Sequence, residues 1–255
     1  MKQPTHVADS WSSLRRLTSA RIALGRAGGS LPTAQVLDFA LAHAAAKDAV
    51  HTALDVESLI ASLAELGVSP LLLATAASDR ETYLRRPDLG RRLDETSRAA
   101  LAALNHAECD VAMIAADGLS APAAQTQVGP LLRELLPLLA AASLRLGPLC
   151  IVRQARVAVE DEIGQLLRAR VAVILIGERP GLGSAESLGA YLVFEPRPGR
   201  TDAQRNCISN IRPGGLTPAA AAATLEFLIV QSLRRQLSGV ALKDDRASPA
   251  GRLTN

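Results

Sequence analysis

The chain has 255 residues, of which 48% are hydrophobic and 21% charged, a composition typical of a soluble globular protein with one large or two modest domains. Its formal net charge is +3, and since Lys2, Lys47 and Lys243 are the lysines among 28 basic residues, the other 25 are arginine. Acids nearly balance bases and aromatic residues are few, so we expect no nucleic-acid partner. The longest apolar stretch, residues 135–144, is far shorter than the roughly 20 residues that cross a bilayer, so we expect no membrane partner.

The spacing of the cysteines and histidines indicates the cellular compartment and whether a metal site is expected. Cys109, Cys150 and Cys207 are widely spaced and form no disulfide framework or zinc motif, which favours a reducing compartment. Lys2 is not followed by an apolar segment, so no secretory signal is expected. No histidine is spaced with another histidine or cysteine as metal ligands are. The sequence predicts a cytoplasmic protein without a metal site, and leaves open whether it enters a bacterial microcompartment.

The first third of the chain reads as helical. Residues 1–20 are mostly polar and are expected to form a flexible lead. Pro32-Thr33 starts a predicted helix, and Asp55 caps a second one that ends at Gly67. The pattern therefore predicts a helical region over residues 21–68.

After residue 68 the pattern changes to short apolar runs separated by helical periodicity, and a tail follows at residues 247–255. Helices are predicted over residues 89–104, 123–144 and 159–167, and Thr217 caps a last helix that reaches about residue 237. Strands without polar alternation, separated by helices, indicate a parallel sheet covered on both faces. The predicted class is α/β: a small N-terminal helical region, then a doubly wound, mostly parallel sheet over residues 69–246 with helices on both faces. The predicted strands are residues 71–74, 110–117, 149–152, 171–176 and 191–194.

Three loops follow predicted strands, where doubly wound folds bind ligands: residues 117–120, 177–183 and the stretch through 207–211. The segment that starts at Gly181 begins like a dinucleotide fingerprint, but Glu186 stands where the last glycine belongs. The segment around Ser120 begins like a nucleophile elbow but lacks its closing glycine. Taken alone, each loop is most simply an ordinary strand-to-helix turn.

Groups for catalysis are scarce. The run Glu160-Asp161-Glu162 has the paired carboxylates of an acid–base site, yet acids in the first turn of a helix are also the expected complement of its dipole. We favour the dipole role. No catalytic residue is therefore predicted in this chain.

Longer strings in a fixed order are more specific than any single loop. In that order they resemble the small (light) subunit family of ethanolamine ammonia-lyase, over about residues 14–243. The strings are Tyr83 to Leu93, Asp117 to Ser120, Arg156-Val157, Asp161 to Gly164, Gly177 to Gly183, and Cys207 to Ile211.

The resemblance implies a subunit of an adenosylcobalamin-dependent ammonia-lyase, which converts ethanolamine to acetaldehyde and ammonia. Its partner would be a separate, large TIM-barrel subunit that holds the substrate, in a higher hetero-oligomer. The cofactor would lie between the two chains and perform the radical chemistry, while this chain binds and orients it.

The family's cobalamin contacts carry over onto Val157, Glu178 and Cys207. A carboxylate such as Glu178 accepts hydrogen bonds from the primary amides on the corrin rim. Val157 would pack against the cofactor, and Cys207 is the least telling because a buried cysteine usually acts as a small hydrophobe. Without the resemblance, an ion pair of Glu178 with Arg179 or Arg156 is the simpler role.

The mode of cobalt ligation can also be predicted. Many cobalamin enzymes supply a histidine from an Asp-x-His-x-x-Gly motif, but His6, His43, His51 and His106 have neither the aspartate nor the glycine. We therefore expect base-on binding, in which the cofactor keeps its own benzimidazole as lower ligand, lodged largely in this subunit.

Two alternative functions of the chain remain open: a free-standing, Rossmann-like nucleotide-dependent oxidoreductase that uses the loop at Gly181, and a non-catalytic assembly protein.

Overall fold

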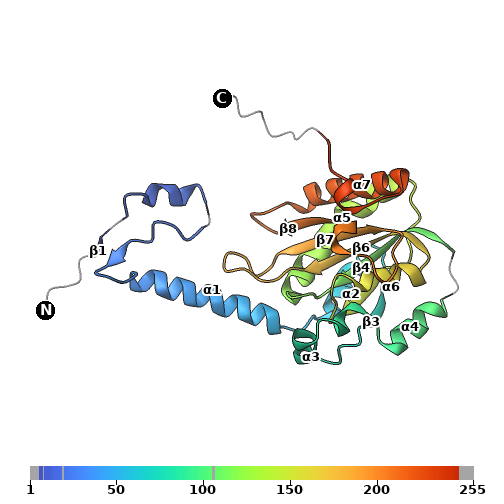
Figure 1. Ribbon diagram of the computed structural model, residues 1–255, viewed down its shortest axis with the longest axis horizontal. Helices are drawn as coiled ribbons and strands as arrows, with labels where there is room; N and C mark the ends of the chain where they lie inside the picture. Colours follow the sequence, from blue (N-terminus) through green and yellow to red (C-terminus); the bar gives the residue numbers. More distant parts are fainter. Residues whose placement is uncertain (1–5, 8, 19, 105–106, 247–255) are drawn as a thin grey trace.

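A computed structural model of the chain describes residues 6–7, 9–18, 20–104 and 107–246. Its centre is a six-stranded sheet in the order β3-β5-β4-β6-β7-β8 (Figure 1). The first four strands of this order run parallel, whereas β7 is antiparallel to both β6 and β8. The predicted α/β class with a mostly parallel sheet is confirmed, and all five predicted strands are present. The bounds are β3 Leu71–Ala74, β4 Cys109–Ala116, β5 Cys150–Arg153, β6 Ala169–Gly177, β7 Leu188–Phe194 and β8 Arg205–Ile211.

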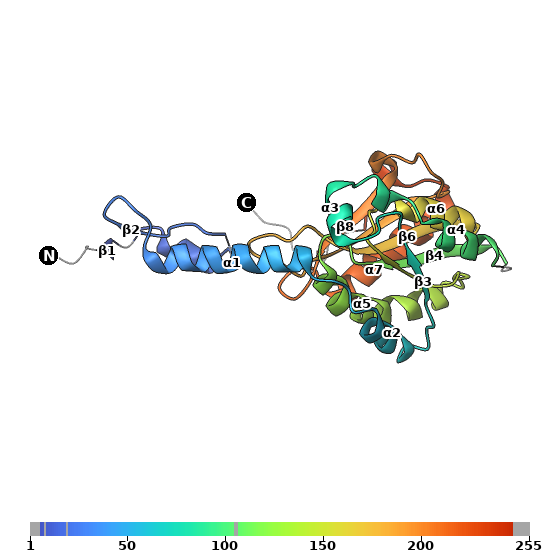
Figure 2. The ribbon, with the colours of Figure 1, turned by 90° about the horizontal axis from the view of Figure 1, so that it is seen from below.

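Helices cover both faces of the sheet. Figure 2 shows α2 (Val56–Ala64) and α5 (Ala121–Ala141) on one side, and α4 (Glu95–Ala102) and α6 (Val159–Leu166) on the other. The last helix, α7 (Pro218–Arg235), packs beside α5 on the first face. Strand β6 serves both cores: its odd-numbered residues 171, 173 and 175 lie in the first core and its even-numbered residues 172, 174 and 176 in the second. This is the two-sided burial that a run without polar alternation predicts.

Side-chain caps mark the starts of α2 and α7. Asp55 accepts a hydrogen bond from the backbone nitrogen of Ser58 at 3.1 Å, and Thr217 accepts one from Ala220 at 3.3 Å. Both caps were predicted from the sequence and are confirmed. They satisfy amide groups that the first turn of a helix leaves without a partner.

The N-terminal part of the chain extends away from this body. We call the described residues up to His51 the arm; it contains β1 (His6–Val7), η1 (Ser12–Arg16), β2 (Arg26–Ala27) and α1 (Thr33–His51) (Figures 1 and 2). Ala49 is the buried residue of α1, while Leu37 and Leu41 are 63% and 71% exposed. One direct link to the body is Arg21, whose Nη1 donates to the carbonyl of Leu182 at 3.2 Å.

Three predictions about elements need correction. The helix predicted over residues 89–104 is split into η2 (Leu89–Arg91) and α4, because Leu93 bridges to Thr75 and Asp94 starts α4 by accepting from the backbone nitrogen of Ser97 at 2.7 Å. Helix α3 (Arg80–Arg85) was not predicted. The predicted loop at residues 207–211 is part of strand β8, whose backbone pairs with β7. The predicted tail, residues 247–255, lies outside the described residues, as do residues 1–5, 8 and 19 of the predicted lead.

The ends of β4 and β6 approach each other backbone to backbone. A Cβ atom at Gly177 would overlap the carbonyl oxygens of Ser120 and Asp117. The carbonyl of Gly177 in turn accepts a hydrogen bond from the backbone nitrogen of Leu119 at 2.9 Å. Only glycine fits at the end of β6 without moving this contact.

Gly177→Ala should therefore destabilise the fold, whereas Gly183→Ala in the following loop should not, since nothing lies within 4 Å of a Cβ there. Overpacking of this kind costs about 1–3 kcal/mol. In a chain of this size each kcal/mol lowers Tm by roughly 2–4 °C, which differential scanning calorimetry resolves. Equal Tm values for the two variants would contradict the close approach.

Candidate functional site

A pocket of about 450 Å³ opens at the carboxyl ends of the parallel strands. It contains Val157 and Glu178, two of the three predicted binding residues. In doubly wound sheets this end is where ligands bind. The pocket is lined by Tyr83, Gly118, Leu119, Arg156, Val157, Ile176, Gly177, Glu178, Arg179 and Tyr191.

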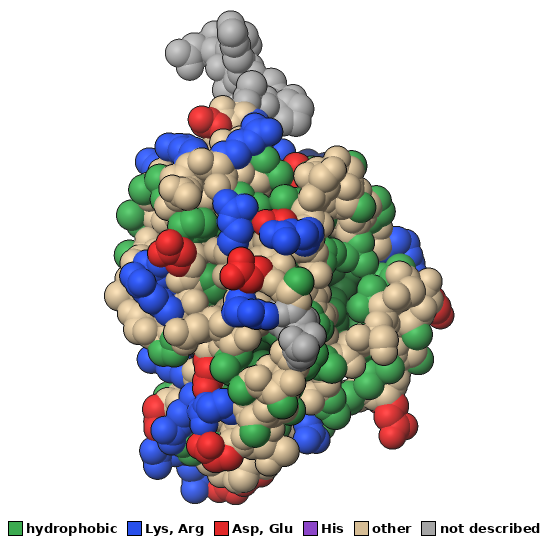
Figure 3. Space-filling view, turned by 90° about the vertical axis from the view of Figure 1, so that its right-hand side faces the viewer, with side chains coloured by type: hydrophobic (Ala, Val, Ile, Leu, Met, Phe, Trp, Pro, Cys, Tyr) green, Lys and Arg blue, Asp and Glu red, His purple; other side chains and the backbone are tan. Residues whose placement is uncertain are grey.

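A larger hollow, about 710 Å³, lies between α5 and α7 beside the start of β6. Leucine, alanine and valine line it together with Arg170, Glu226 and Arg234. Figure 3 looks at the end of the body opposite the arm, where charges of both signs are interspersed among hydrophobic side chains. None of the predicted binding residues lines this hollow, so the pocket at the strand ends is the candidate site.

Glu178 follows β6 and has one carboxylate oxygen available. Its Oε2 accepts hydrogen bonds from Ser187 Oγ at 2.5 Å and from the backbone nitrogen of Asn210 at 3.2 Å. No described residue donates to Oε1, and no ion pair joins Glu178 to Arg179 or Arg156 in the described chain. The simple arginine pairing is therefore absent, and Glu178 is oriented by β7 and β8 with an acceptor left over.

Asp117 positions the turn that carries Val157. Its carboxylate is buried at the end of β4 and accepts hydrogen bonds from the backbone nitrogens of Gln154 at 2.9 Å and Ala155 at 3.1 Å. The guanidinium of Arg80 lies 3.5 Å away. Burial raises the pKa of Asp117, while these donors oppose that shift. The carboxylate thus holds the backbone just before Val157 in place.

Tyr83 forms one wall of the pocket between two arginines. The Tyr83 side chain is fully buried, and its hydroxyl donates to the carbonyl of Ala155 at 3.0 Å. The guanidinium carbons of Arg80 and Arg156 lie 4.7 and 4.2 Å from the ring centroid, a cation–π arrangement. Burial raises the pKa of Tyr83 to about 12, so the phenol stays neutral. Tyr83 was not predicted as a site residue, although both tyrosines of the chain, Tyr83 and Tyr191, line the pocket.

Cys207 lies beside the pocket rather than in its lining. It sits on β8 opposite Tyr191 of β7, three residues before Asn210, whose backbone contacts Glu178. Neighbouring atoms partly desolvate the thiolate and raise the pKa of the Cys207 thiol, and the charge of Glu178 adds to this. Cys207 is exposed, however, so the expectation of a buried cysteine that packs as a small hydrophobe is wrong. The raised pKa keeps the thiol protonated, which disfavours a nucleophilic role.

The two loops that resemble catalytic motifs have structural roles. Gly181 and Ser184 exchange backbone hydrogen bonds of 2.9 and 3.2 Å in a tight loop that joins β6 to the antiparallel strand β7. No helix follows, so the predicted strand-to-helix turn is wrong here and the helix N-terminus of a dinucleotide site is missing. Ser120 is buried, caps α5 and donates to the carbonyl of Ala185 at 2.7 Å.

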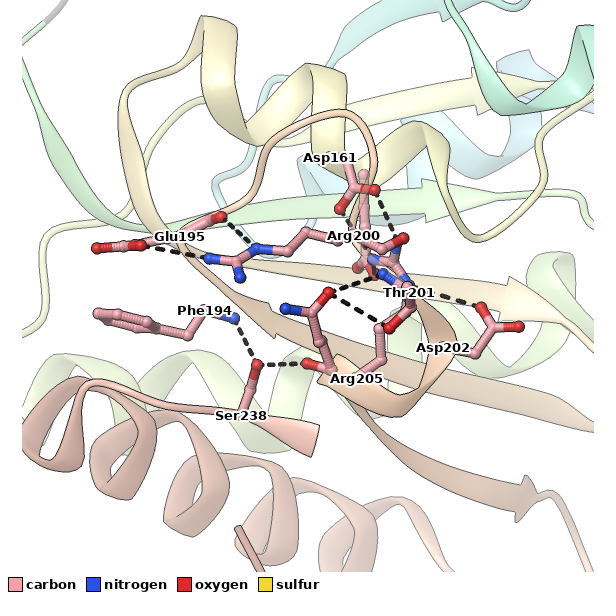
Figure 4. Close-up of polar contacts among 10 residues, drawn as sticks. Asp161, Phe194, Glu195, Arg200, Thr201, Asp202, Arg205 and Ser238 are labelled. Atoms are coloured by element: carbon pink, nitrogen blue, oxygen red, sulfur yellow. Dashed lines mark hydrogen bonds and ion pairs between the residues drawn. The ribbon is translucent and has the colours of Figure 1, made fainter. Parts of the chain in front are cut away.

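The acidic first turn of α6 belongs to a buried ion-pair cluster (Figure 4). Arg205, at the start of β8, donates from Nη1 to Glu160 Oε1 at 2.6 Å and from Nη2 to Asp161 Oδ2 at 2.6 Å. The three side chains are at most 3% exposed. The predicted dipole role is therefore incomplete, since two of these acids fix α6, which follows Val157, to the strand that carries Cys207.

This cluster contains two carboxylates and one guanidinium. Ionisation of both acids would leave an excess negative charge away from water, which is unfavourable. Burial raises the pKa of both carboxyl groups, that of Glu160 to about 8. Glu160 Oε2 has no hydrogen-bond partner among the described residues. Near neutral pH, Glu160 is thus the group that retains its proton.

A raised pKa in the folded state makes stability depend on pH. The folded chain binds the Glu160 proton more tightly than the unfolded chain, so this contribution is complete below the ordinary pKa of 4.5 and is lost as pH rises through about 8. Glu160→Gln removes the titration. The wild-type Tm should fall more steeply than the variant Tm between pH 5 and pH 9, as measured by circular dichroism, with the exposed Glu195→Gln as control. Parallel Tm profiles of wild type and Glu160→Gln would be inconsistent with a protonated Glu160.

The chain is an α/β protein with a pocket at the carboxyl ends of its parallel strands. The pocket offers an apolar side chain, one free carboxylate oxygen and two guanidiniums, without a nucleophile–base pair among its described lining residues. In the described part of the chain, no cluster of three or more histidine, cysteine or acidic residues is arranged to hold a metal ion. Nor is any described helix both long and apolar enough to span a membrane.

Comparison with known proteins then identifies the family. The model of the ethanolamine ammonia-lyase light chain matches residues 8–243. The ethanolamine ammonia-lyase small subunit of Azotobacter vinelandii is 56% identical over 239 residues, covering 92% of this chain and 88% of the relative. Those of Xanthomonas campestris and Pseudomonas fluorescens are 52% and 53% identical, covering 94% and 96% of this chain and 90% of each relative. The chain belongs to the ethanolamine ammonia-lyase light-chain family.

Proposed function

We propose that this chain is the small subunit of an adenosylcobalamin-dependent ethanolamine ammonia-lyase and holds the cofactor against a large subunit. The observation that carries the proposal is the pocket lined by both Val157 and Glu178, where no described residue donates to Glu178 Oε1. Family membership supplies the class of ligand. The large subunit is proposed to be a TIM-barrel chain in a higher hetero-oligomer, in the cytoplasm.

The pocket residues fit a share of such a cofactor. The pocket volume of about 450 Å³ is typical of a small-ligand site and too small to enclose a whole corrinoid. This size suits a half-site that a second chain completes. Glu178 Oε1 can accept from an amide on the corrin rim, and Val157 offers an apolar surface. Cys207 borders this site on β8.

The chain's own contribution is binding and orientation. When bound, the cofactor supplies radical chemistry through homolysis of its cobalt–carbon bond. The phenol of Tyr83 keeps its proton, and Ser120 is buried in its capping role, so neither acts as a base or nucleophile. We therefore assign substrate binding and proton transfer to the large subunit.

Glu178→Ala should weaken cofactor binding by the co-expressed complex. A hydrogen bond to a charged acceptor contributes about 1.5–3 kcal/mol, which corresponds to a roughly 10- to 150-fold rise in the apparent Kd for adenosylcobalamin. The KM for ethanolamine should barely change, and Cys207→Ala should have a smaller effect than Glu178→Ala. Corrinoid retained after ultrafiltration and steady-state kinetics measure the two constants.

Glu186→Ala is the matched control, because Glu186 is an exposed acid in the same loop. An unchanged Kd for Glu178→Ala would make Glu178 a purely structural residue. A wild-type complex that binds no cobalamin would refute the proposed function.

The cofactor should bind base-on. Among the described histidines, His6 lies on β1 and His43 and His51 lie on α1, and neither His43 nor His51 lines the pocket. Electron paramagnetic resonance of the cob(II)alamin state, with nitrogen-15 in the benzimidazole of the cofactor, should show a changed superhyperfine splitting. An unchanged splitting that responds instead to nitrogen-15 histidine in the protein would overturn base-on binding.

A further inference from the structure

Arg156 is a half-buried cation without an anion. Its Nη2 donates to the carbonyl of Tyr83 at 3.3 Å, its guanidinium stacks on the Tyr83 ring, and its Nε is buried with no hydrogen-bond partner among the described residues. No described carboxylate lies within ion-pair distance of Arg156. Four other half-buried arginines each reach an acid: Arg21 reaches Asp38, Arg80 reaches Asp117, Arg98 reaches Glu162, and Arg200 reaches Glu195. Half-buried Arg212 has neutral acceptors instead, Asn210 Oδ1 and the carbonyl of Pro213.

An unpaired guanidinium that has lost part of its hydration is costly, so its position calls for an external anion. The backbone specifically makes room for this side chain. A Cβ at Gly90 would lie 2.9 Å from Arg156 Cγ, and the carbonyl of Gly90 accepts from the backbone nitrogen of Arg156 at 2.7 Å. The arginine stem is therefore held in a slot that directs the guanidinium to one place.

Arg156 stands where two cavities meet. A second cavity of about 400 Å³ shares Arg156 and Val157 with the candidate site and is also lined by Arg91, Arg200 and Asp202. Arg200 is neutralised by Glu195, and Asp202 is fully exposed. Arg91 directly follows Gly90 and has no carboxylate within ion-pair distance in the described chain. Two uncompensated guanidiniums thus lie beside the apolar Val157.

We propose that Arg156, assisted by Arg91, is a phosphate-binding site that takes the phosphodiester of the cofactor's nucleotide tail. The inference rests on the proposed function and extends it to a group that Val157, Glu178 and Cys207 do not address. A phosphodiester carries one negative charge with two free oxygens, and the planar guanidinium matches that geometry better than an ammonium does. The neutral amides of the corrin rim offer no such charge.

Binding of three corrinoids distinguishes the contribution of the phosphate from that of the rest of the cofactor. Cobinamide lacks the whole nucleotide tail, cobinamide phosphate adds the phosphate alone, and cobalamin carries the complete tail. With the complex of both subunits, Arg156→Met should weaken binding of cobalamin and cobinamide phosphate by about 10- to 100-fold and leave cobinamide within about twofold. Retention after ultrafiltration measures all three Kd values without turnover.

Two further variants keep the test decisive. Arg153→Met removes an exposed arginine at the end of β5 that lines neither cavity, so it should leave every Kd unchanged. Arg91→Met alters an exposed side chain that the fold does not need, and it should cause a smaller loss with the same selectivity for the phosphate-bearing ligands. This second variant remains informative if Arg156→Met lowers Tm.

Several outcomes would overturn the phosphate site. Equal losses for cobinamide and cobalamin in Arg156→Met would make Arg156 a rim contact or a structural residue. Unchanged ratios in both arginine variants would mean that its anion comes from the partner subunit. Tight binding of adenosine monophosphate that no corrinoid displaces would indicate a separate nucleotide site. A wild-type complex that binds none of the corrinoids would instead refute the proposed function, and the phosphate site with it.

Discussion

The carboxylate of Asp117 is the constraint on which the candidate site depends. It lies at the end of the central strand β4 and accepts the backbone amides of residues 154 and 155, which fixes the exit of β5. Arg80, beside it, donates to the carbonyls of Gly118 and Val50, so the start of α3 and the end of α1 are held at the same point. One buried acid thus gathers four segments that are distant in sequence. Removal of this side chain would leave the two backbone amides without their acceptor.

The parts of the fold that could be predicted are mostly those that depend on the local pattern of apolar and polar residues. Apolar runs that lack polar alternation become β4 to β7 because both faces of the sheet are covered there. Strand β8 escaped prediction because it is an edge strand: Asn206, Ser209 and Asn210 give it a polar sequence, and only its pairing with β7 makes it a strand. The direction of β7 was equally hidden, since an apolar run does not say which way it enters the sheet.

Some residues of the candidate site could likewise be predicted from the sequence, and others could not. Val157 and Glu178 could be named because each lies inside a recognisable string, and the structure places them on one pocket. Tyr83 and Arg156 become conspicuous only in three dimensions. The exposed fraction of a guanidinium and the absence of an acid beside it depend on how α3, β4 and the turn after β5 converge. Similarly, the acids of α6 look like an ordinary first turn until Arg205 arrives from β8.

The passage from β6 to β7 by a hairpin has a consequence for variation in this fold. A crossover between parallel strands must span the sheet, so its length and path are tied to the helix that it contains. The length of the loop after Glu178 is not constrained in this way. The backbone hydrogen bond from Glu178 to the carbonyl of Ser187 closes the base of the hairpin before the loop begins. Residues can be added or removed beyond that base without shifting the register of β6 on β7. The loop that begins with Arg179, a residue of the pocket lining, can therefore vary in length while Glu178 stays in place.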